Sequence, residues 1–254
     1  MPVRSILIAL RFLTRLPLPP AGDITPRDAA WSMMAFPLVG AIMGLLLVAA
    51  DGLAHWLWPP LPASAMVLVT WVLLSGGLHL DGFIDCCDAL WSAKSPAERL
   101  EILRDVHTGA YGVVGAVLLL MGKWAMLAGL EWPLRGRILV MAPAIARWTM
   151  TYATWRYPYA RRGPGLGAWF KSELRGRHVL VGAAAGSAVC LAAGGPFGLA
   201  LFVLGWLTAV GLARWSQARL GGLTGDVYGM ICELVEVVLL AGALLAAARF
   251  PTFL

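Results

Sequence analysis

Residues 30–50 have the sequence AWSMMAFPLVGAIMGLLLVAA, which contains no charged side chain. A helix needs about 20 mostly apolar residues to cross a bilayer, so this segment is long enough to span a membrane. Six further segments share its apolar character, of which 63–80 and 179–193 are short and could be tilted, broken or re-entrant. The seven candidate spans are residues 30–50, 63–80, 111–130, 138–155, 179–193, 197–213 and 231–248.

The composition of the whole chain also indicates a membrane protein. Charged residues make up 13% of the 254 residues, whereas about 25% is typical of soluble domains. Hydrophobic residues make up 59%, more than one soluble core could bury. The same composition excludes intrinsic disorder, and four cysteines, two of them adjacent, exclude a secreted disulfide scaffold. The predicted fold is therefore an all-α, polytopic integral membrane bundle of about six or seven transmembrane helices, with residues 1–254 forming a single domain.

The N-terminal residues 6–18 are apolar but are interrupted by Arg11 and Arg15, which predicts a helix lying in the membrane interface. The basic residues also predict the orientation. Fifteen of the 20 Lys and Arg residues fall on the side of the N-terminus and three fall on the other side, so the positive-inside rule places the N-terminus in the cytoplasm. Seven spans put the C-terminus outside, whereas one re-entrant span would return it to the cytoplasm.

The most informative segment for chemistry is GGLHLDGFIDCCD, residues 76–88, at the predicted cytoplasmic end of the second span. Its carboxylates Asp81, Asp85 and Asp88 are four and three residues apart, which places them on one face of a helix. Like charges at this spacing repel one another, and a divalent cation would remove the repulsion. Hard oxygen ligands favour Mg²⁺, Mn²⁺ or Ca²⁺ over Zn²⁺. The alternative is a solvated acidic helix end without a metal.

A second acidic segment, GGLTGDVYG, surrounds Asp226 and is followed by Glu233 and Glu236. Both acidic segments are predicted on the cytoplasmic side, so they could converge on one site with two metals, or with one metal and a base. The alternative is a tight glycine turn whose carboxylates pair with Arg214 or Arg219.

Two cations, Lys123 and Arg147, fall inside predicted spans, where a charge is costly unless it faces a partner or a cavity. They could clamp a phosphorylated substrate or pair with acidic residues of the bundle. The loop over residues 156–178 is strongly basic and contains Arg161, which suggests either a mobile phosphate-binding loop or a topology signal that attracts anionic lipid. Carboxylates for a metal and cations for phosphate together indicate phosphoryl-group transfer.

These segments together resemble the cobalamin synthase family, the adenosylcobinamide-GDP ribazoletransferases. The resemblance is collinear over nearly the whole chain, and its most specific parts are HLDG-x2-D-x2-D and GGLTGD-x-YG. One departure is the Cys86–Cys87 pair, where small or polar residues are more usual. The matching segments are residues 12–17, 36–40, 77–88, 104–105, 109–112, 123–124, 147–148 and 221–229, with Glu233 and Glu236.

The resemblance implies a Mg²⁺-dependent enzyme of the bacterial inner membrane, with its active site facing the cytoplasm. Such an enzyme joins adenosylcobinamide-GDP to α-ribazole or its 5′-phosphate, releases GMP and forms adenosylcobalamin or its 5′-phosphate. The residues expected to be catalytic are Asp81, Asp85, Asp88 and Asp226, and these four with Glu233 are expected to bind the metal. The residues expected to contact substrate are Arg15, Arg104, Asp105, Lys123, Arg147 and Arg161.

Three other classes of protein remain open at this level. A lipid-forming CDP-alcohol phosphotransferase would carry Ala-Arg after its aspartate motif, and this chain lacks that pair after Asp81-Gly82. A cation transporter would place acidic residues at the bilayer midplane, and a non-catalytic scaffold would serve other corrinoid enzymes. The partners expected are the two substrates and membrane lipid, without nucleic acid. A homo-oligomer, or a complex with corrinoid-pathway enzymes, is left open.

Overall fold

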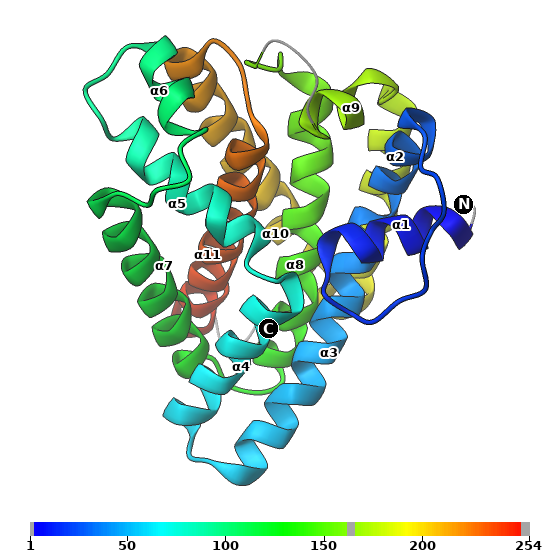
Figure 1. Cartoon of the computed structure of the whole chain (residues 1–254). Coiled ribbons are helices and arrows are strands. Elements are labelled where there is room, and N and C mark those ends of the chain that lie inside the picture. Colours follow the sequence, from blue (N-terminus) through cyan, green and yellow to red (C-terminus); the bar gives the residue numbers. More distant parts are fainter. Residues whose placement is uncertain (1–2, 162–165, 250–254) are drawn as a thin grey trace.

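The computed structural model describes residues 3–161 and 166–249, and this part of the chain is helical apart from its connections and one isolated β-bridge between Tyr159 and Leu223 (Figure 1). The helices are α1 (Val3–Leu13), α2 (Pro26–Ser32), η1 (Met33–Ala35), α3 (Phe36–Leu57), α4 (Pro60–Ser75), α5 (Leu78–Leu90), α6 (Pro96–Ile102), α7 (Ala110–Gly129), α8 (Leu134–Arg156), α9 (Leu166–Ser172), α10 (Gly176–Leu220) and α11 (Gly225–Arg249).

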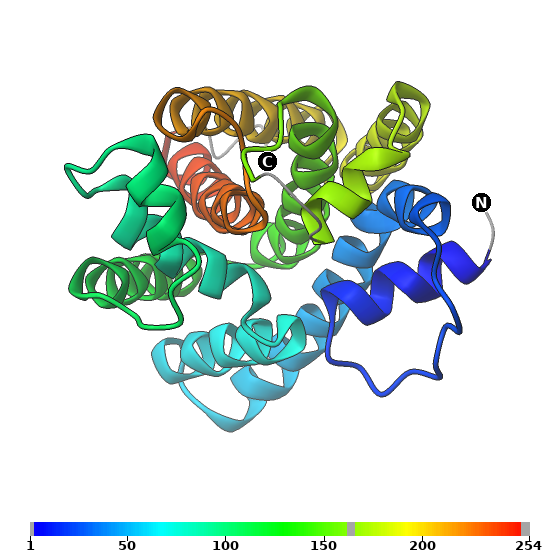
Figure 2. The ribbon, with the colours of Figure 1, turned by 45° about the horizontal axis from the view of Figure 1, so that its top comes forward.

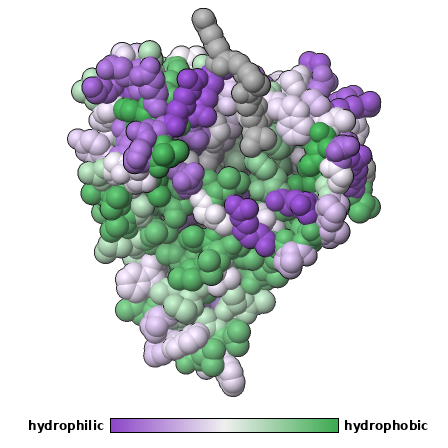
Figure 3. All heavy atoms as spheres, in the orientation of Figure 1, coloured by the Kyte–Doolittle hydropathy of each residue, from purple (hydrophilic) through white to green (hydrophobic). Residues whose placement is uncertain are grey.

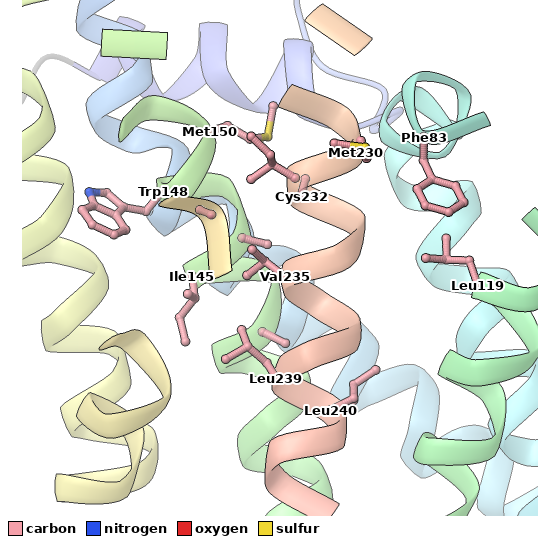
Figure 4. Close-up of a cluster of buried hydrophobic side chains, with 14 of the residues drawn as sticks. Phe83, Leu119, Ile145, Trp148, Met150, Met230, Cys232, Val235, Leu239 and Leu240 are labelled. Atoms are coloured by element: carbon pink, nitrogen blue, oxygen red, sulfur yellow. The ribbon is translucent and has the colours of Figure 1, made fainter. Parts of the chain in front are cut away.

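Helices α8 and α11 form the centre of the bundle. Helix α8 packs against α3, α10 and α11, and α11 is enclosed by α5, α7, α8 and α10 (Figure 2). Apolar side chains of α11 such as Val235 and Leu239 lie next to Ile145 of α8 (Figure 4). Helix α3 approaches α8 closely because Gly40 has no side chain; a Cβ there would lie 2.6 Å from the Cα of Ala144. Small residues allow this backbone contact, as is common between membrane helices.

The structure confirms a polytopic helical membrane protein but contains fewer qualifying spans than predicted. By length and composition, four stretches of the described chain could cross a membrane, at residues 26–57, 110–129, 176–220 and 225–249; the bent pair α4–α5 would make a fifth. The predicted span at 138–155 lies in α8, which is 23 residues long. It does not qualify because Arg147 and three threonines make it too polar.

Helix α10 accounts for the other difference in the number of spans. Its 45 residues include both predicted spans at 179–193 and 197–213, and the backbone leaves helical geometry at Gly195. A straight helix of this length would extend roughly 68 Å. Yet Gly176 lies beside Trp155 and Gly222 beside Pro158, so both ends of α10 return to the same end of α8. The two predicted segments are therefore separate antiparallel halves of one broken helix.

The second predicted span, residues 63–80, is also broken. Helix α4 ends at Ser75 and α5 begins at Leu78, and the two helix axes differ by 92°. Gly76 and Gly77 between them have φ angles of 63° and 71°, a conformation that glycine adopts without steric cost. The chain therefore turns within the bundle and sends α5 sideways toward α7, which places the acidic segment at the bend.

Helix α1 crosses the outside of the bundle next to α2 and α3 (Figures 1 and 2). It buries Ile8 and Leu13 and exposes Arg4 and Arg11, as expected of an interfacial helix, but it ends at Leu13 rather than near residue 18. Hydrophilic residues gather around the end of the molecule that carries α6, α9 and α2, and hydrophobic residues dominate the opposite end (Figure 3). This division is the one expected of a bundle that emerges from a membrane on one side.

Candidate active site

A cavity of about 570 Å³ lies between the bend at α5, the start of α11 and the helices α1, α3, α8 and α9. The acidic segments of α5 and α11 both form part of its wall, which is the convergence that their shared side of the membrane would allow. Its lining residues are Phe12, Met33, Phe36, Leu78, His79, Asp81, Gly82, Arg104, Met150, Thr154, Tyr159, Arg161, Gly167, Phe170, Gly225, Asp226, Tyr228 and Gly229.

Glycines bring α5 and α11 into direct backbone contact at this wall. A Cβ on Gly82 would lie 2.8 Å from the Cα of Asp226, and a Cβ on Gly229 would lie 2.9 Å from the carbonyl oxygen of His79. Real Cβ contacts at such distances essentially never occur, so both positions require glycine. This close approach places Asp81, at the start of α5, and Asp226, at the start of α11, on one cavity wall.

Arg161 forms an ion pair with Asp226 of this acidic pair. Its Nη2 donates to Oδ2 of Asp226 at 2.6 Å and to the carbonyl oxygen of Leu103 at 2.7 Å. The Thr224 hydroxyl donates to the same Asp226 oxygen at 3.1 Å. The arginine that pairs with Asp226 is therefore Arg161 from the basic loop, and the carboxylate is held in one orientation.

The other predicted aspartates of α5 have different surroundings. Asp85 is half-buried one turn after Asp81, within electrostatic reach of Asp81, Asp88 and Asp226. Asp88 lies outside the cavity lining and accepts hydrogen bonds from the backbone N–H groups of Gly109 (2.8 Å) and Gly112. These groups belong to the first turn of α7, where a carboxylate is stabilised by the helix dipole. Asp88 therefore caps α7.

The oxygen atoms at the cavity can be compared with the coordination that a metal ion requires. Within residues 3–161 and 166–249, no group of three or more His, Cys, Asp or Glu side chains is arranged to hold a metal by itself. Mg²⁺ does not require such a group, because it is usually bound by one or two carboxylates together with substrate phosphates and water. The hard oxygens of Asp81 and Asp226, which line an open cavity rather than a closed cage, fit this type of site. Asp85 lies outside the lining but within electrostatic reach of both carboxylates.

Lys123 and Arg147 lie in a buried ionic network instead of the cavity wall. The Nζ atom of Lys123 lies 2.5 Å from carboxylate oxygens of both Glu233 and Glu236, and Arg147 donates to Glu236. All four side chains are almost completely buried, and two positive charges balance two negative ones. Of the two alternatives drawn from the sequence, pairing with acidic residues is the one that these contacts support.

His79 lies between the cavity and this ionic network. It is 1% exposed, its Nδ1 lies 3.6 Å from the Cys232 sulfur, and its Nε2 has no hydrogen-bond partner among the described residues.

Tyr159 is a further polar residue of the cavity lining. Burial raises the pKa of its phenol, so the phenol stays protonated at neutral pH. The HLDG motif contained the signal for His79, whereas nothing in the sequence singled out Tyr159.

The three remaining predicted substrate contacts lie in different places. Arg104 lines the cavity. Arg15 is exposed, and its side chain packs over Gly76 at the α4–α5 bend. Asp105 lies outside the lining and pairs with His107 at 2.6 Å, and this hydrogen bond lowers the pKa of Asp105. The structure thus brings Arg104 and Arg161 to the acidic wall and leaves Asp105 on the surface.

Comparisons with known proteins complete the description. The family model described as Cobalamin-5-phosphate synthase matches residues 5–244. An adenosylcobinamide-GDP ribazoletransferase from Pseudomonas entomophila is 40% identical over 239 residues, covering 92% of this chain and 96% of the relative. Proteins of the same name from a Roseiflexus species and Desulfitobacterium hafniense are 38% and 37% identical, covering 97% and 95% of this chain and 91% and 96% of the relatives. No solved structure shows a significant match.

Proposed function

The chain belongs to the cobalamin-5-phosphate synthase family, and from this membership we propose that it transfers the adenosylcobinamide-phosphate group of adenosylcobinamide-GDP to the ribose hydroxyl of α-ribazole or α-ribazole 5′-phosphate. The reaction releases GMP and forms adenosylcobalamin or its 5′-phosphate, the last step in assembling the nucleotide loop of vitamin B12. The observation that carries the proposal is the cavity wall that combines Asp81 and Asp226 with Arg104 and Arg161. Phosphoryl transfer relies on such carboxylates and cations.

The residues of this wall have distinct roles in the proposed reaction. The ribose hydroxyl attacks the phosphorus that carries cobinamide, and the bond from this phosphorus to the GMP oxygen breaks. Asp226, oriented by Arg161 and Thr224, accepts the hydroxyl proton. Arg104 and Arg161 bind phosphate oxygens and stabilise the charge that passes to GMP.

We propose Mg²⁺ as the cofactor, with Asp81 and Asp85 as the residues that would hold it. When bound, the ion would neutralise the charge of the pyrophosphate. Asp88 and Glu233, also expected to bind metal, are not proposed as ligands, because the N-terminus of α7 and Lys123 already engage their oxygens.

We place the protein in the bacterial inner membrane with the cavity facing the cytoplasm. The cavity lies toward the end where hydrophilic residues gather (Figure 3), and the positive-inside rule assigns this end to the cytoplasm. A volume of about 570 Å³ is in the range that holds one drug-sized ligand. The pyrophosphate therefore enters the cavity, and the much larger corrin ring stays at its mouth.

Reconstituted protein tests the proposed reaction. Liposomes containing the purified chain would be incubated with adenosylcobinamide-GDP and α-ribazole 5′-phosphate, with Mg²⁺ or with EDTA, and assayed for GMP and cobalamin phosphate. We expect both products with Mg²⁺ and neither with EDTA. Asp81→Asn should form no product, whereas the matched surface variant Glu101→Gln should match the wild type. Equal product yields with Mg²⁺ and with EDTA would refute the requirement for Mg²⁺. If wild-type protein inserted in the liposomes formed no product, the proposed reaction would be refuted.

A further inference from the structure

The cavity has a second wall whose chemistry differs from that of the acidic wall. This aromatic wall consists of Phe12, Met33, Phe36, Met150 and Phe170, contributed by α1, η1, α3, α8 and α9. The acidic wall comes from α5 and α11. The ribbon shows these two helices on one side of the molecule and α1 and α9 on the other (Figures 1 and 2). One cavity thus joins a surface for charged phosphate to a surface for an apolar group.

The three phenylalanines of the aromatic wall form one packed cluster. The ring centroid of Phe12 lies 6.0 Å from that of Phe36, with the planes inclined by 18°, and 4.8 Å from that of Phe170. Phe36 and Phe170 are buried, and Phe12 is half-buried. The ring of Phe170 is inclined by 48° to that of Phe12 and by 65° to that of Phe36, so the three rings form a rigid apolar cluster rather than one plane. Such a cluster can pack against the face or the edge of a ring ligand.

Phe170 is held in place although it belongs to a short helix. The neighbouring Lys171 donates from Nζ to the carbonyl oxygens of Thr154 (2.6 Å) and Tyr157 (2.7 Å), which lie at the C-terminal end of α8. A cation at this end of a helix binds carbonyl groups that have no partner within the helix. This anchor ties α9, and with it the aromatic wall, to the central helix of the bundle.

We propose that the aromatic wall binds the base of the acceptor nucleoside and selects an apolar bicyclic base over a purine. This inference rests on the proposed function. The dimethylbenzimidazole of ribazole is flat and carries two methyl groups on its outer edge, without hydrogen-bond donors there. Guanine carries donors and acceptors on its edge, and phenylalanine and methionine side chains would leave them unpaired at a cost in binding.

Two polar side chains lie where the acceptor's ribose must connect the two walls. Tyr228 is 5% exposed, and its hydroxyl has no hydrogen-bond partner among the described residues. It follows Asp226 by two positions and lines the cavity together with Thr154, whose hydroxyl donates to the carbonyl of Met150. With the base on the aromatic wall, the sugar lies against Tyr228 and Thr154, and its attacking hydroxyl reaches Asp226.

Kinetics of matched phenylalanine variants test the inference. Phe12→Leu and Phe170→Leu remove a ring from the aromatic wall, and Phe202→Leu removes a buried ring that packs on Trp148 outside the cavity lining. We expect KM for α-ribazole to rise about tenfold or more in the first two variants. KM for adenosylcobinamide-GDP should stay near the wild-type value, and Phe202→Leu should change neither. A rise in the KM of the donor instead would mean that guanine binds this wall. Unchanged KM values for both substrates would mean that the aromatic wall binds neither of them.

A second experiment uses only the wild-type chain, so it decides the question even if a variant fails to fold. Equilibrium dialysis without the donor would compare labelled α-ribazole with benzimidazole riboside and adenosine. We expect affinity to fall in that order, by about tenfold or more between α-ribazole and adenosine. Equal affinities, or no binding of α-ribazole, would overturn the inference. Selective binding in a protein that forms no product would instead refute the proposed reaction alone.

Discussion

The assignment of Asp88 as a cap for α7 makes a prediction that separates it from Asp81. Asp88→Ala removes the acceptor of the hydrogen bonds from Gly109 and Gly112. Loss of a helix cap costs about 0.5–2 kcal/mol, and loss of a negative charge at a helix N-terminus costs about 0.3–1 kcal/mol. The free energy of unfolding should therefore fall by about 1–3 kcal/mol. At roughly 2–4 °C per kcal/mol for a chain near this size, Tm should fall by roughly 2–12 °C.

Activity should respond in the opposite way at the two positions. Asp88→Asn keeps an oxygen acceptor for α7 and lies outside the cavity lining, so it should retain most of its turnover. Asp81→Asn should lose turnover without a change in Tm, because Asp81 faces the cavity and the structure gives no hydrogen bond from it to another described side chain. Thermal unfolding in detergent, followed by circular dichroism, and product formation below the lowest Tm measure the two effects.

The reasoning would be refuted by the reverse pattern at Asp88. If Asp88→Asn abolished turnover while its Tm equalled that of the wild type, Asp88 would be a metal ligand, as its helical spacing with Asp81 and Asp85 predicts. The protein would then have to release the N-terminus of α7 during the reaction.

Three further variants test the ionic network and the acidic wall. Lys123→Met should lower the free energy of unfolding by about 3–5 kcal/mol, since it leaves buried carboxylates uncompensated. Adding Glu233→Gln to this variant should recover part of the loss. Denaturant unfolding of the single and the double variant measures both effects. Gly82→Ala should lower turnover by about tenfold or more, because its Cβ would displace α11. The control Gly211→Ala places its Cβ in open space and should leave turnover unchanged. Equal turnover in the two variants would contradict the close approach of α5 and α11. Arg161→Gln should lower kcat/KM for the donor by about tenfold or more in initial-rate assays. An unchanged kcat/KM would mean that Arg161 does not bind the phosphate of the donor.

The sequence was sufficient to predict the fold class and two of its breaks. The short second span could have been tilted, broken or re-entrant, and the glycines at 76 and 77 break it. The segments on either side of Gly195 were expected as separate spans, and the chain reverses there. More spans were predicted than qualify, because α8 has the length of a span but is too polar, and because two predicted spans lie in the single broken helix α10. The charge of Arg147 in α8 is balanced by Glu236 of α11. Hydropathy does not register this pairing, because it joins two helices distant in the sequence.

The candidate site was predicted in part, for a similar reason. Helical spacing correctly placed three aspartates on α5, and motif position placed Asp226 near them. Spacing could not show that Asp88 turns to α7, because that depends on where a later helix begins. It also could not show the aromatic wall, since Phe12, Phe36 and Phe170 come from three separate helices and each resembles an ordinary core residue in its own segment.

A structure of the chain with adenosylcobinamide-GDP bound tests the central claim most directly. The account predicts that the pyrophosphate lies in the cavity, within contact distance of Arg104 and Arg161, with Asp81 and Asp226 around the reacting phosphorus. A pyrophosphate bound at the network of Lys123 and Arg147, or on the surface away from the acidic wall, would contradict it.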